Sequence, residues 1–187
     1  MKLTIEAGLL CEAIQHCSPN RGRRPDDSAV DLVVVHSISL PPGEYAGDAV
    51  ARFFCNELRS DEHPYYQQIA DLQVSAHLFI RRTGEVNQFV NFDERAWHAG
   101  RSSYEGREEC NDYSIGIELE GTDEDAFEPQ QYVALAAVIR ALEAYYPRFT
   151  TDRIAGHSDV APGRKTDPGK GFDWSRLRAQ LSSSTTF

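Results

Sequence analysis

The sequence predicts a single α/β domain built around a mixed β-sheet. Short runs of β-branched and other apolar residues, typical of strands, alternate along the chain with segments whose apolar residues recur at helical spacing. No internal repeat or linker interrupts the 187 residues, so one substantial core is the simplest organisation. The apolar share of 41% and the charged share of 26% are ordinary for a globular protein.

The first third of the chain predicts an extension, a central strand and a helix. Residues 1–29 are expected to form an N-terminal extension and loop packed on the domain. The polar run at 18–27 contains three arginines that could meet an anionic ligand, but a solvated surface loop is the simpler interpretation. The continuous β-branched run at 31–38 predicts a buried central strand, and 48–59 predicts a helix capped by Asp48.

The middle of the chain predicts a hairpin and a further strand. Strands are predicted at residues 74–81, 85–90 and 113–120, with a possible short helix within 61–72 and a polar loop at 101–112. Thr83-Gly84 supplies the hairpin turn. On the strand 113–120, Gly116 leaves room for another group to approach the sheet beside Glu118.

The last third predicts two helices around a loop. Pro129 suits the first position of a long helix, which Pro147 ends. A short strand is expected near Ile154, followed by a Pro- and Gly-rich loop at 156–169. Asp173 can cap a final helix, after which residues 182–187 are expected to be frayed, so that the main domain spans 30–181.

Charge and composition exclude several classes of partner. The net charge of −10 argues against binding to a nucleic-acid backbone. No window approaches the roughly 18 consecutive apolar residues of a membrane helix. Glu6 and Glu12 interrupt any signal-peptide core, and the four cysteines form no CxxC pair. We therefore expect a cytoplasmic protein with reduced thiols and no membrane association.

Three residues in the chain are candidates for a zinc site. His157 and Asp167 are zinc ligand types in the loop 156–169, and a catalytic zinc needs a third protein ligand with one position left open. His36, at the exit of the central strand, is a candidate, although a histidine at a strand end is more often structural. Elsewhere, Trp97 beside His98 could contact a sugar ring or simply anchor a loop, and Glu118 alone could be a solvated carboxylate.

Four segments together resemble one family. They are 34–44 around His36, 96–100 around Trp97, 110–121 around Glu118, and 156–169 with its His157-(x)₇-Lys165-Thr-Asp167 spacing. In this order they are similar to the AmpD-type amidases, the 1,6-anhydro-N-acetylmuramyl-L-alanine amidases of the zinc amidase-2 group. The resemblance extends from about residue 30 to about residue 177.

The resemblance implies both a fold and a set of site residues. The fold is that of the peptidoglycan-recognition proteins, a mixed sheet flanked by helices. One zinc ion per chain would lie on His36, His157 and Asp167. Glu118 would be the base that acts on the zinc-bound water, and Lys165 would stabilise the oxyanion.

The resemblance also implies substrate contacts. Trp97 and His98 would line the muramyl pocket, and Ser37 would be a short donor to the substrate where many members have asparagine. Some members carry a basic residue where Gln73 or Glu109 stands here, which leaves the contacts to the stem-peptide carboxylates open.

The implied function is zinc-dependent hydrolysis of the amide bond between the lactyl group of (1,6-anhydro)-N-acetylmuramic acid and L-Ala. The substrate would be a small muropeptide from cytoplasmic peptidoglycan recycling, and the activity would indirectly limit β-lactamase induction. One alternative is a binding module of the same fold, which should have lost a ligand. Another is an amidase that acts on intact wall outside the cytoplasm, which should carry a signal peptide.

Overall fold

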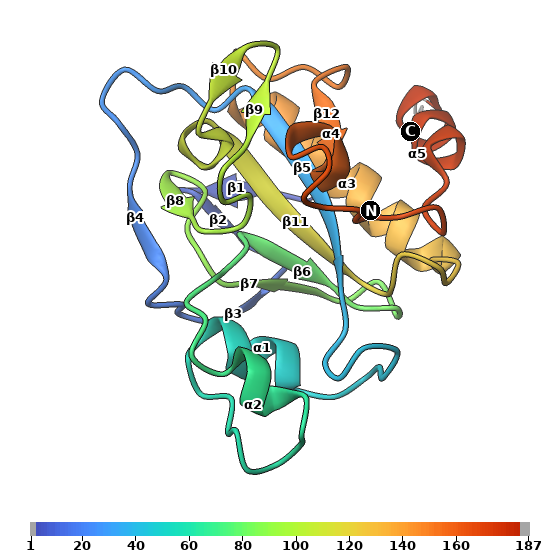
Figure 1. The fold of residues 1–187 in the computed structure, drawn as a ribbon. Helices are drawn as coiled ribbons and strands as arrows, with labels where there is room; N and C mark the ends of the chain where they lie inside the picture. The colour runs from blue at the N-terminus through green and yellow to red at the C-terminus, as the bar shows by residue number, and fades with distance from the viewer. Residues whose placement is uncertain (1–2, 184–187) are drawn as a thin grey trace.

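The computed structural model describes residues 3–183 and confirms the predicted α/β fold. Its centre is a six-stranded mixed sheet in the order β12-β5-β11-β6-β7-β3 (Figure 1). The strands are β12 (Ile154–Gly156), β5 (Leu32–Ile38), β11 (Ser114–Glu120), β6 (Leu78–Ile80), β7 (Val86–Gln88) and β3 (Ile14–Gln15). The first four run parallel to one another, and the predicted hairpin joins β6 to β7 in antiparallel pairing.

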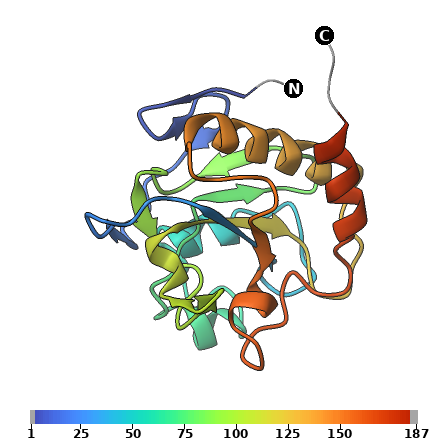
Figure 2. The same ribbon diagram turned by 90° about the horizontal axis from the view of Figure 1, so that it is seen from above.

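One face of the sheet is covered by α3 (Pro129–Tyr145), and α5 (Trp174–Ser182) packs beside that helix (Figure 2). Both helices begin where the sequence predicts: Pro129 is in the first turn of α3, and the Asp173 carboxylate accepts a hydrogen bond from the backbone N–H of Arg176. The apolar stripe of α3 and the inward side chains of β5 and β11 share the main core. The face of the sheet covered by α3 therefore forms the main core and contributes to the stability of the domain.

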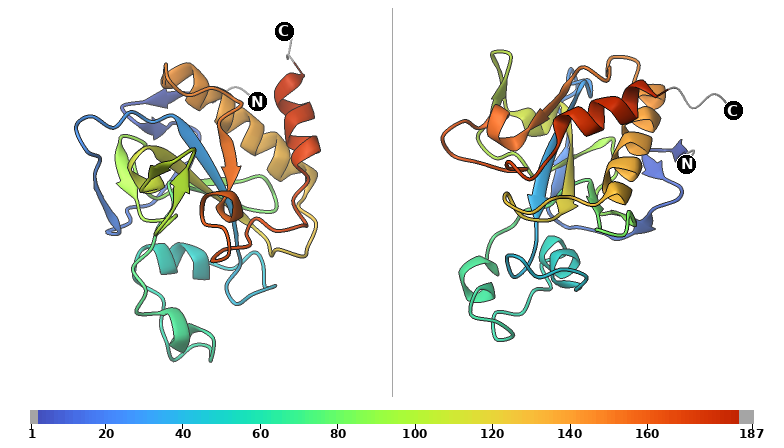
Figure 3. Two further views of the ribbon diagram at one scale, coloured as in Figure 1. Left: turned by 45° about the horizontal axis from the view of Figure 1, so that its top comes forward. Right: turned by 90° about the vertical axis from the view of Figure 1, so that its right-hand side faces the viewer.

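The opposite face is covered by shorter elements. The helices α1 (Ala49–Phe54) and α2 (Tyr66–Ile69) lie at one end, and α4 (His157–Val160) lies across the sheet from α3 (Figure 3). Between 97 and 113 the chain forms the hairpin β9 (Ser103–Tyr104) and β10 (Arg107–Glu108) and a 3₁₀ turn, η1 (Cys110–Asp112).

Two loop predictions and one helix prediction are wrong in detail. The polar loop at 101–112 folds into the β9–β10 hairpin because Glu105 and Gly106 both take positive φ angles, 50° and 81°, as in a type I′ turn. The predicted loop at 156–169 begins with the helical turn α4, in which the Asp159 carboxylate accepts the Gly156 N–H at 2.7 Å. The helix predicted at 48–59 ends at Phe54, since Asn56 is left-handed with φ 59°.

The N-terminal segment is more regular than predicted. It forms the hairpin β1 (Ile5–Glu6) and β2 (Leu9–Leu10), adds β3 to the sheet edge, and pairs β4 (Arg21–Arg23) with β8 (Glu94–Ala96). Arg24 is buried rather than solvated, because its guanidinium donates to the carbonyls of Phe92, Asn111, Asp112 and Ser114. Residues 21–23 therefore form a strand rather than a loop, with Arg21 and Arg23 exposed as predicted, and the predicted solvation is wrong for Arg24.

Two further expectations concern a frayed C-terminal tail and the absence of a membrane-spanning helix. Ser182 is the last residue of α5, and residues 184–187 of the predicted frayed tail lie outside the described part of the chain. Within residues 3–183, none of the helices has the length and apolar character needed to cross a bilayer.

Candidate active site

The predicted site residues gather at the carboxyl ends of three parallel strands, on the face opposite α3. His36 on β5 and Glu118 on β11 are register partners, so their side chains leave the sheet side by side. His157 directly follows the last residue of β12, which pairs with β5. Open α/β sheets bind ligands at this edge because several strand ends and their loops converge there.

His36, His157 and Asp167 bring three donor atoms together. The Nδ1 atoms of His36 and His157 are 2.9 Å apart, and Asp167 Oδ2 lies 3.1 Å from the first and 3.0 Å from the second. Asp167 reaches this position because the backbone N–H of Ser158 donates to the Asp167 carbonyl at 2.9 Å, which folds the loop back onto α4. The predicted triad is therefore a compact triangle, although its residues come from distant segments.

The protonation states of the two histidine rings favour binding of a cation between the three donor atoms. His157 Nε2 donates to the Ala99 carbonyl oxygen at 3.1 Å, and a carbonyl can only accept, so Nδ1 of neutral His157 carries a lone pair. Burial lowers the pKa of His36 to about 4, which keeps its ring neutral at physiological pH. In the tautomer that leaves a lone pair on His36 Nδ1 as well, two lone pairs and a carboxylate would repel one another at these distances without a positive charge between them.

The same triangle fits zinc. Zinc binds nitrogen and oxygen at about 2.0–2.2 Å in tetrahedral geometry, which places neighbouring ligand atoms about 3.3–3.5 Å apart. The donor atoms here lie 2.9–3.1 Å apart, so a small outward movement would accommodate the ion. Two imidazoles and one carboxylate with an open fourth position are a ligand set of catalytic zinc sites.

Glu118 faces this triangle from the neighbouring strand. Its Oε2 atom is buried and has no hydrogen-bond partner among the described residues. Burial raises the pKa of Glu118 well above its usual range, the nearby Asp167 carboxylate acts in the same direction, and Lys165 opposes both. An unpartnered carboxyl group with a raised pKa is suited to accept and return a proton.

Glu120, two residues further along β11, has a different role. Its carboxylate accepts the backbone N–H groups of Ala46 at 2.7 Å and Arg82 at 3.0 Å. Both oxygens are thus engaged in holding two surface loops onto the strand end. This carboxylate is structural, whereas that of Glu118 is free to react.

A pocket of about 400 Å³ opens over the triangle. Glu118, Lys165, Trp97, His98 and Ser37 line it together with His157 and Asp167. Lys165 is exposed on the loop that follows α4, so its ammonium can approach the pocket from the solvent side. The structure therefore brings all eight predicted site residues together.

The rest of the pocket is formed by residues that the sequence did not predict. An apolar wall comes from the region of α1 and α2, with Leu40, Phe53, Tyr65, Ile69, Leu72 and Val74. Asp123 lies on the other side and accepts a hydrogen bond from the Ser37 hydroxyl at 3.2 Å. The position of Gly121-Thr122-Asp123 directly after a predicted strand was a signal that could have identified this side, whereas nothing local marked the apolar wall.

His98 lines the pocket, but both its ring nitrogens contact the protein. Nδ1 is 2.9 Å from His36 Nε2, and Nε2 is 3.1 Å from Ser114 Oγ. Gly116 provides the space for this ring, because a Cβ at position 116 would lie 2.3 Å from His98 Cγ. The group that approaches the sheet at Gly116 is therefore His98.

His77, the residue directly before β6, is fully buried and does not line the pocket. Its Nδ1 accepts the Gly116 N–H at 3.0 Å, and its Nε2 lies 3.0 Å from both Arg24 Nη2 and the Glu94 carbonyl. These contacts give it a structural role.

Comparison with known proteins places this site in a family. Residues 26–170 match the family model described as N-acetylmuramoyl-L-alanine amidase. A relative from Salmonella typhimurium, named 1,6-anhydro-N-acetylmuramyl-L-alanine amidase AmpD, is 53% identical over 96% of this chain and 96% of its own length.

Two solved structures are similar to the fold described here. A crystal structure of a selenomethionine derivative of AmpD has a TM-score of 0.92 and 53% identity, and the match covers 95% of this chain and 99% of that chain. The Escherichia coli N-acetylmuramyl-L-alanine amidase AmiD, solved with the substrate anhydro-N-acetylmuramic acid-L-Ala-D-γ-Glu-L-Lys, has a TM-score of 0.59 and 26% identity, over 95% of this chain and 65% of that chain.

Proposed function

Because this chain belongs to the N-acetylmuramoyl-L-alanine amidase family, we propose that it hydrolyses the amide bond between the lactyl group of 1,6-anhydro-N-acetylmuramic acid and L-Ala, with zinc as cofactor. The observation that carries the proposal is the triangle of His36, His157 and Asp167 donor atoms beside the unpartnered Glu118 carboxyl group. The anhydro specificity is supported by the name of the Salmonella typhimurium relative and by the substrate in the AmiD complex.

His36, His157 and Asp167 would hold one zinc ion per chain. A bound zinc ion supplies a Lewis acid that polarises a carbonyl group and makes water more acidic. Because all three ligands and both further polar groups, Glu118 and Lys165, are present, the alternative of a module that binds muropeptides without cutting them has no feature in its favour.

The protein's own residues carry the proton and the developing charge. Glu118 takes a proton from the water molecule that attacks the lactyl carbonyl carbon. When the C–N bond breaks, Glu118 delivers that proton to the leaving amine of L-Ala, so that a carboxylic acid and a free amine result. The Lys165 ammonium stabilises the negative charge that develops on the carbonyl oxygen.

The pocket offers two kinds of contact to the substrate. The half-buried Trp97 ring would pack against the anhydro sugar, whose bicyclic shape exposes more apolar surface than a free reducing end. Ser37, His98 and the apolar wall complete the lining. The Ser37 hydroxyl has one proton, which it gives to Asp123 at 3.2 Å, so to act as a donor to the substrate it would turn that proton away from Asp123.

We place the activity in cytoplasmic recycling of wall fragments, where it would limit the anhydromuropeptides that induce β-lactamase in bacteria that sense them. A strain lacking the gene should accumulate intact anhydromuropeptides. An unchanged muropeptide pool in that strain would contradict this placement.

The direct test compares two substrates that differ only at the sugar. The purified protein is incubated with an anhydromuramyl tripeptide and with the matching reducing-end muramyl tripeptide, and mass spectrometry identifies the products. We expect release of the tripeptide with a free L-Ala amine and a higher kcat/KM for the anhydro form. Cleavage at another bond would refute the amidase assignment, and equal kcat/KM values would refute the anhydro preference.

A further inference from the structure

Both histidine ligands make their second ring contact with one dipeptide, His98–Ala99. His157 Nε2 contacts the Ala99 carbonyl oxygen at 3.1 Å, and His36 Nε2 contacts His98 Nδ1 at 2.9 Å. A histidine binds a metal through one nitrogen only if the proton sits on the other, so the partner of that other nitrogen sets the tautomer. A backbone carbonyl can only accept a hydrogen bond, so it fixes the tautomer of its partner by itself. A second imidazole can donate or accept, so the tautomer of His36 depends on which nitrogen of His98 carries the proton.

A chain of hydrogen bonds places the proton of His98. The Ser114 hydroxyl donates to the Cys110 carbonyl at 2.6 Å, so its oxygen accepts from His98 Nε2–H at 3.1 Å. With its proton on Nε2, neutral His98 presents a lone pair at Nδ1. His36 must then carry its proton on Nε2, which leaves the lone pair on Nδ1, the atom in the triangle.

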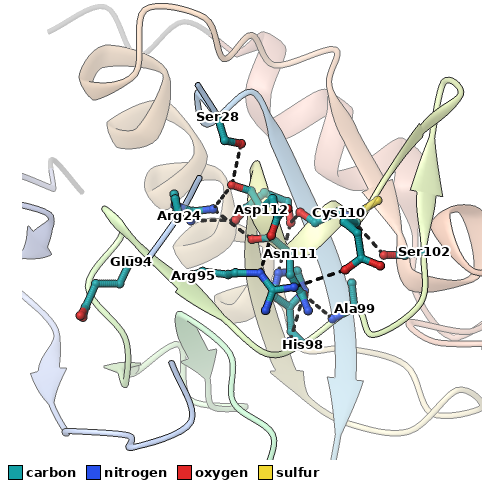
Figure 4. Close-up of polar contacts among 12 residues, drawn as sticks. Arg24, Ser28, Glu94, Arg95, His98, Ala99, Ser102, Cys110, Asn111 and Asp112 are labelled. Carbon is teal, nitrogen blue, oxygen red and sulfur yellow. Dashed lines mark hydrogen bonds and ion pairs between the residues drawn. The ribbon is translucent and has the colours of Figure 1, made fainter. Parts of the chain in front are cut away.

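The backbone of the dipeptide is held by Asn111, a residue that does not line the pocket. The Asn111 side-chain oxygen accepts the backbone N–H groups of His98 at 3.2 Å and Ala99 at 2.8 Å (Figure 4). Asn111 belongs to η1 and is itself buried. Together with the space at Gly116, this anchoring fixes the position of the His98 ring relative to His36.

We propose that His98 is a positioning residue of the metal site, which directs the lone pair of His36 toward the metal through the chain from Cys110 and Ser114. Its ring nitrogens are then not available to bind a sugar hydroxyl, although the ring lines the pocket. This inference rests on the proposed zinc function, and it assigns His98 to the metal rather than to the substrate.

The test uses two substitutions of similar size. In His98→Leu the acceptor for His36 is lost, whereas in His98→Asn the side-chain oxygen can take the place of Nδ1. Zinc affinity is measured by competition with a chromophoric chelator. We expect His98→Leu to bind zinc about 10–100-fold more weakly than the wild type, and His98→Asn to recover most of that loss. Equal affinities of wild type and His98→Leu, or equally weak binding by both variants, would overturn the proposal.

A second readout needs no metal, no substrate and no substitution. Imidazole ¹⁵N spectra of the metal-free wild-type protein report which nitrogen carries the proton. We expect protonated Nε2 and unprotonated Nδ1 in both His36 and His98, and a proton on His98 Nδ1 would refute the proposal even if His98→Leu proves too unstable to study. A wild-type protein with this tautomer pattern that neither binds zinc nor cuts muropeptides would instead refute the proposed function.

Discussion

At the scale of single residues, two carboxylates and one ammonium on the same side of the sheet have different surroundings. The Glu118 carboxyl group has a buried oxygen without a partner, while both oxygens of Glu120 accept backbone N–H groups. Lys165 is exposed on its loop and lines the pocket. These differences predict which side chains take part in the reaction.

Replacing Glu118 by glutamine should lower kcat about 10²–10⁴-fold with zinc still bound, because the proton acceptor is lost while the ligands are intact. Glu120→Gln is the matched control: we expect a much smaller change in kcat, since Glu120 holds loops rather than the reacting atoms. Steady-state kinetics and zinc content of both variants check this. If Glu120→Gln is as inactive as Glu118→Gln, the wrong carboxylate has been assigned.

Lys165→Ala should lower kcat about 10²–10³-fold, by analogy with the removal of an oxyanion donor, and leave substrate binding nearly intact. The ammonium meets negative charge only as that charge develops, so the loss appears in kcat rather than in KM. Kinetics with zinc content as a control provide the measurement. A variant that keeps zinc and near-normal kcat would show that Lys165 is only a surface charge.

At the scale of elements, β11 organises the site through alternate residues. Gly116, Glu118 and Glu120 lie on the same face of the strand. Gly116 makes room for His98, Glu118 faces the triangle of His36, His157 and Asp167, and Glu120 holds two loops. The apolar residues between them join the main core against α3. One strand thus connects the stability of the domain to the geometry of the site.

Gly116→Ala should weaken zinc binding about tenfold or more, because the new Cβ would displace the His98 ring that orients His36. Gly47→Ala is the matched control, since a Cβ there has no atom closer than 4.0 Å, and we expect unchanged zinc affinity. The chelator competition measures both. Unchanged zinc binding in a folded Gly116→Ala protein would contradict this account of β11.

The sequence predicts the long elements well and the short ones poorly. β5, β11, α3 and α5 appear where their apolar patterns and caps place them, because each packs apolar side chains against the main core. The helical turn α4 and the strand β4 lie in segments whose sequences predict loops. α4 is stabilised by a local hydrogen bond from the Gly156 N–H to the Asp159 carboxylate, and β4 forms because it pairs with the distant strand β8. Hydrophobic periodicity does not report such contacts.

At the scale of the whole molecule, the N-terminal segment completes the domain. Leu10 is fully buried in the main core, and the Gln88 side chain contacts the Leu10 N–H at 2.7 Å and the Gly8 carbonyl at 3.0 Å. The predicted boundary between an extension at 1–29 and a domain at 30–181 stays a prediction. These contacts argue that the segment contributes to the stability of the domain.

Leu10→Ala should lower the free energy of unfolding by about 2–5 kcal/mol, as for other fully buried leucines. Its neighbour Leu9 is 41% exposed on the same strand, and Leu9→Ala should change stability by no more than about 0.5 kcal/mol. Denaturant unfolding of both variants provides the comparison. Equal, small effects would show that residues 1–29 are a peripheral extension.

The triangle of His36, His157 and Asp167 could be predicted from the sequence as a single set only through the resemblance, because the spacing from His36 to Asp167 carries no geometric information of its own. The apolar pocket wall and the supporting roles of Ala99, Asn111 and Ser114 could not be predicted. Those roles depend on which backbone and side-chain atoms meet after folding, and no local residue pattern encodes them.

The proposed amidase activity requires one zinc ion on His36, His157 and Asp167, so a zinc titration of the metal-free protein tests that requirement. Protein stripped by a chelator is titrated with zinc while release of the tripeptide from an anhydromuramyl tripeptide is followed. Activity should be absent at the start, rise in proportion to added zinc and level off at one equivalent per chain. The variant Glu118→Gln should take up the same equivalent and stay nearly inactive. Full activity of the stripped protein, or no recovery on addition of zinc, would contradict the account.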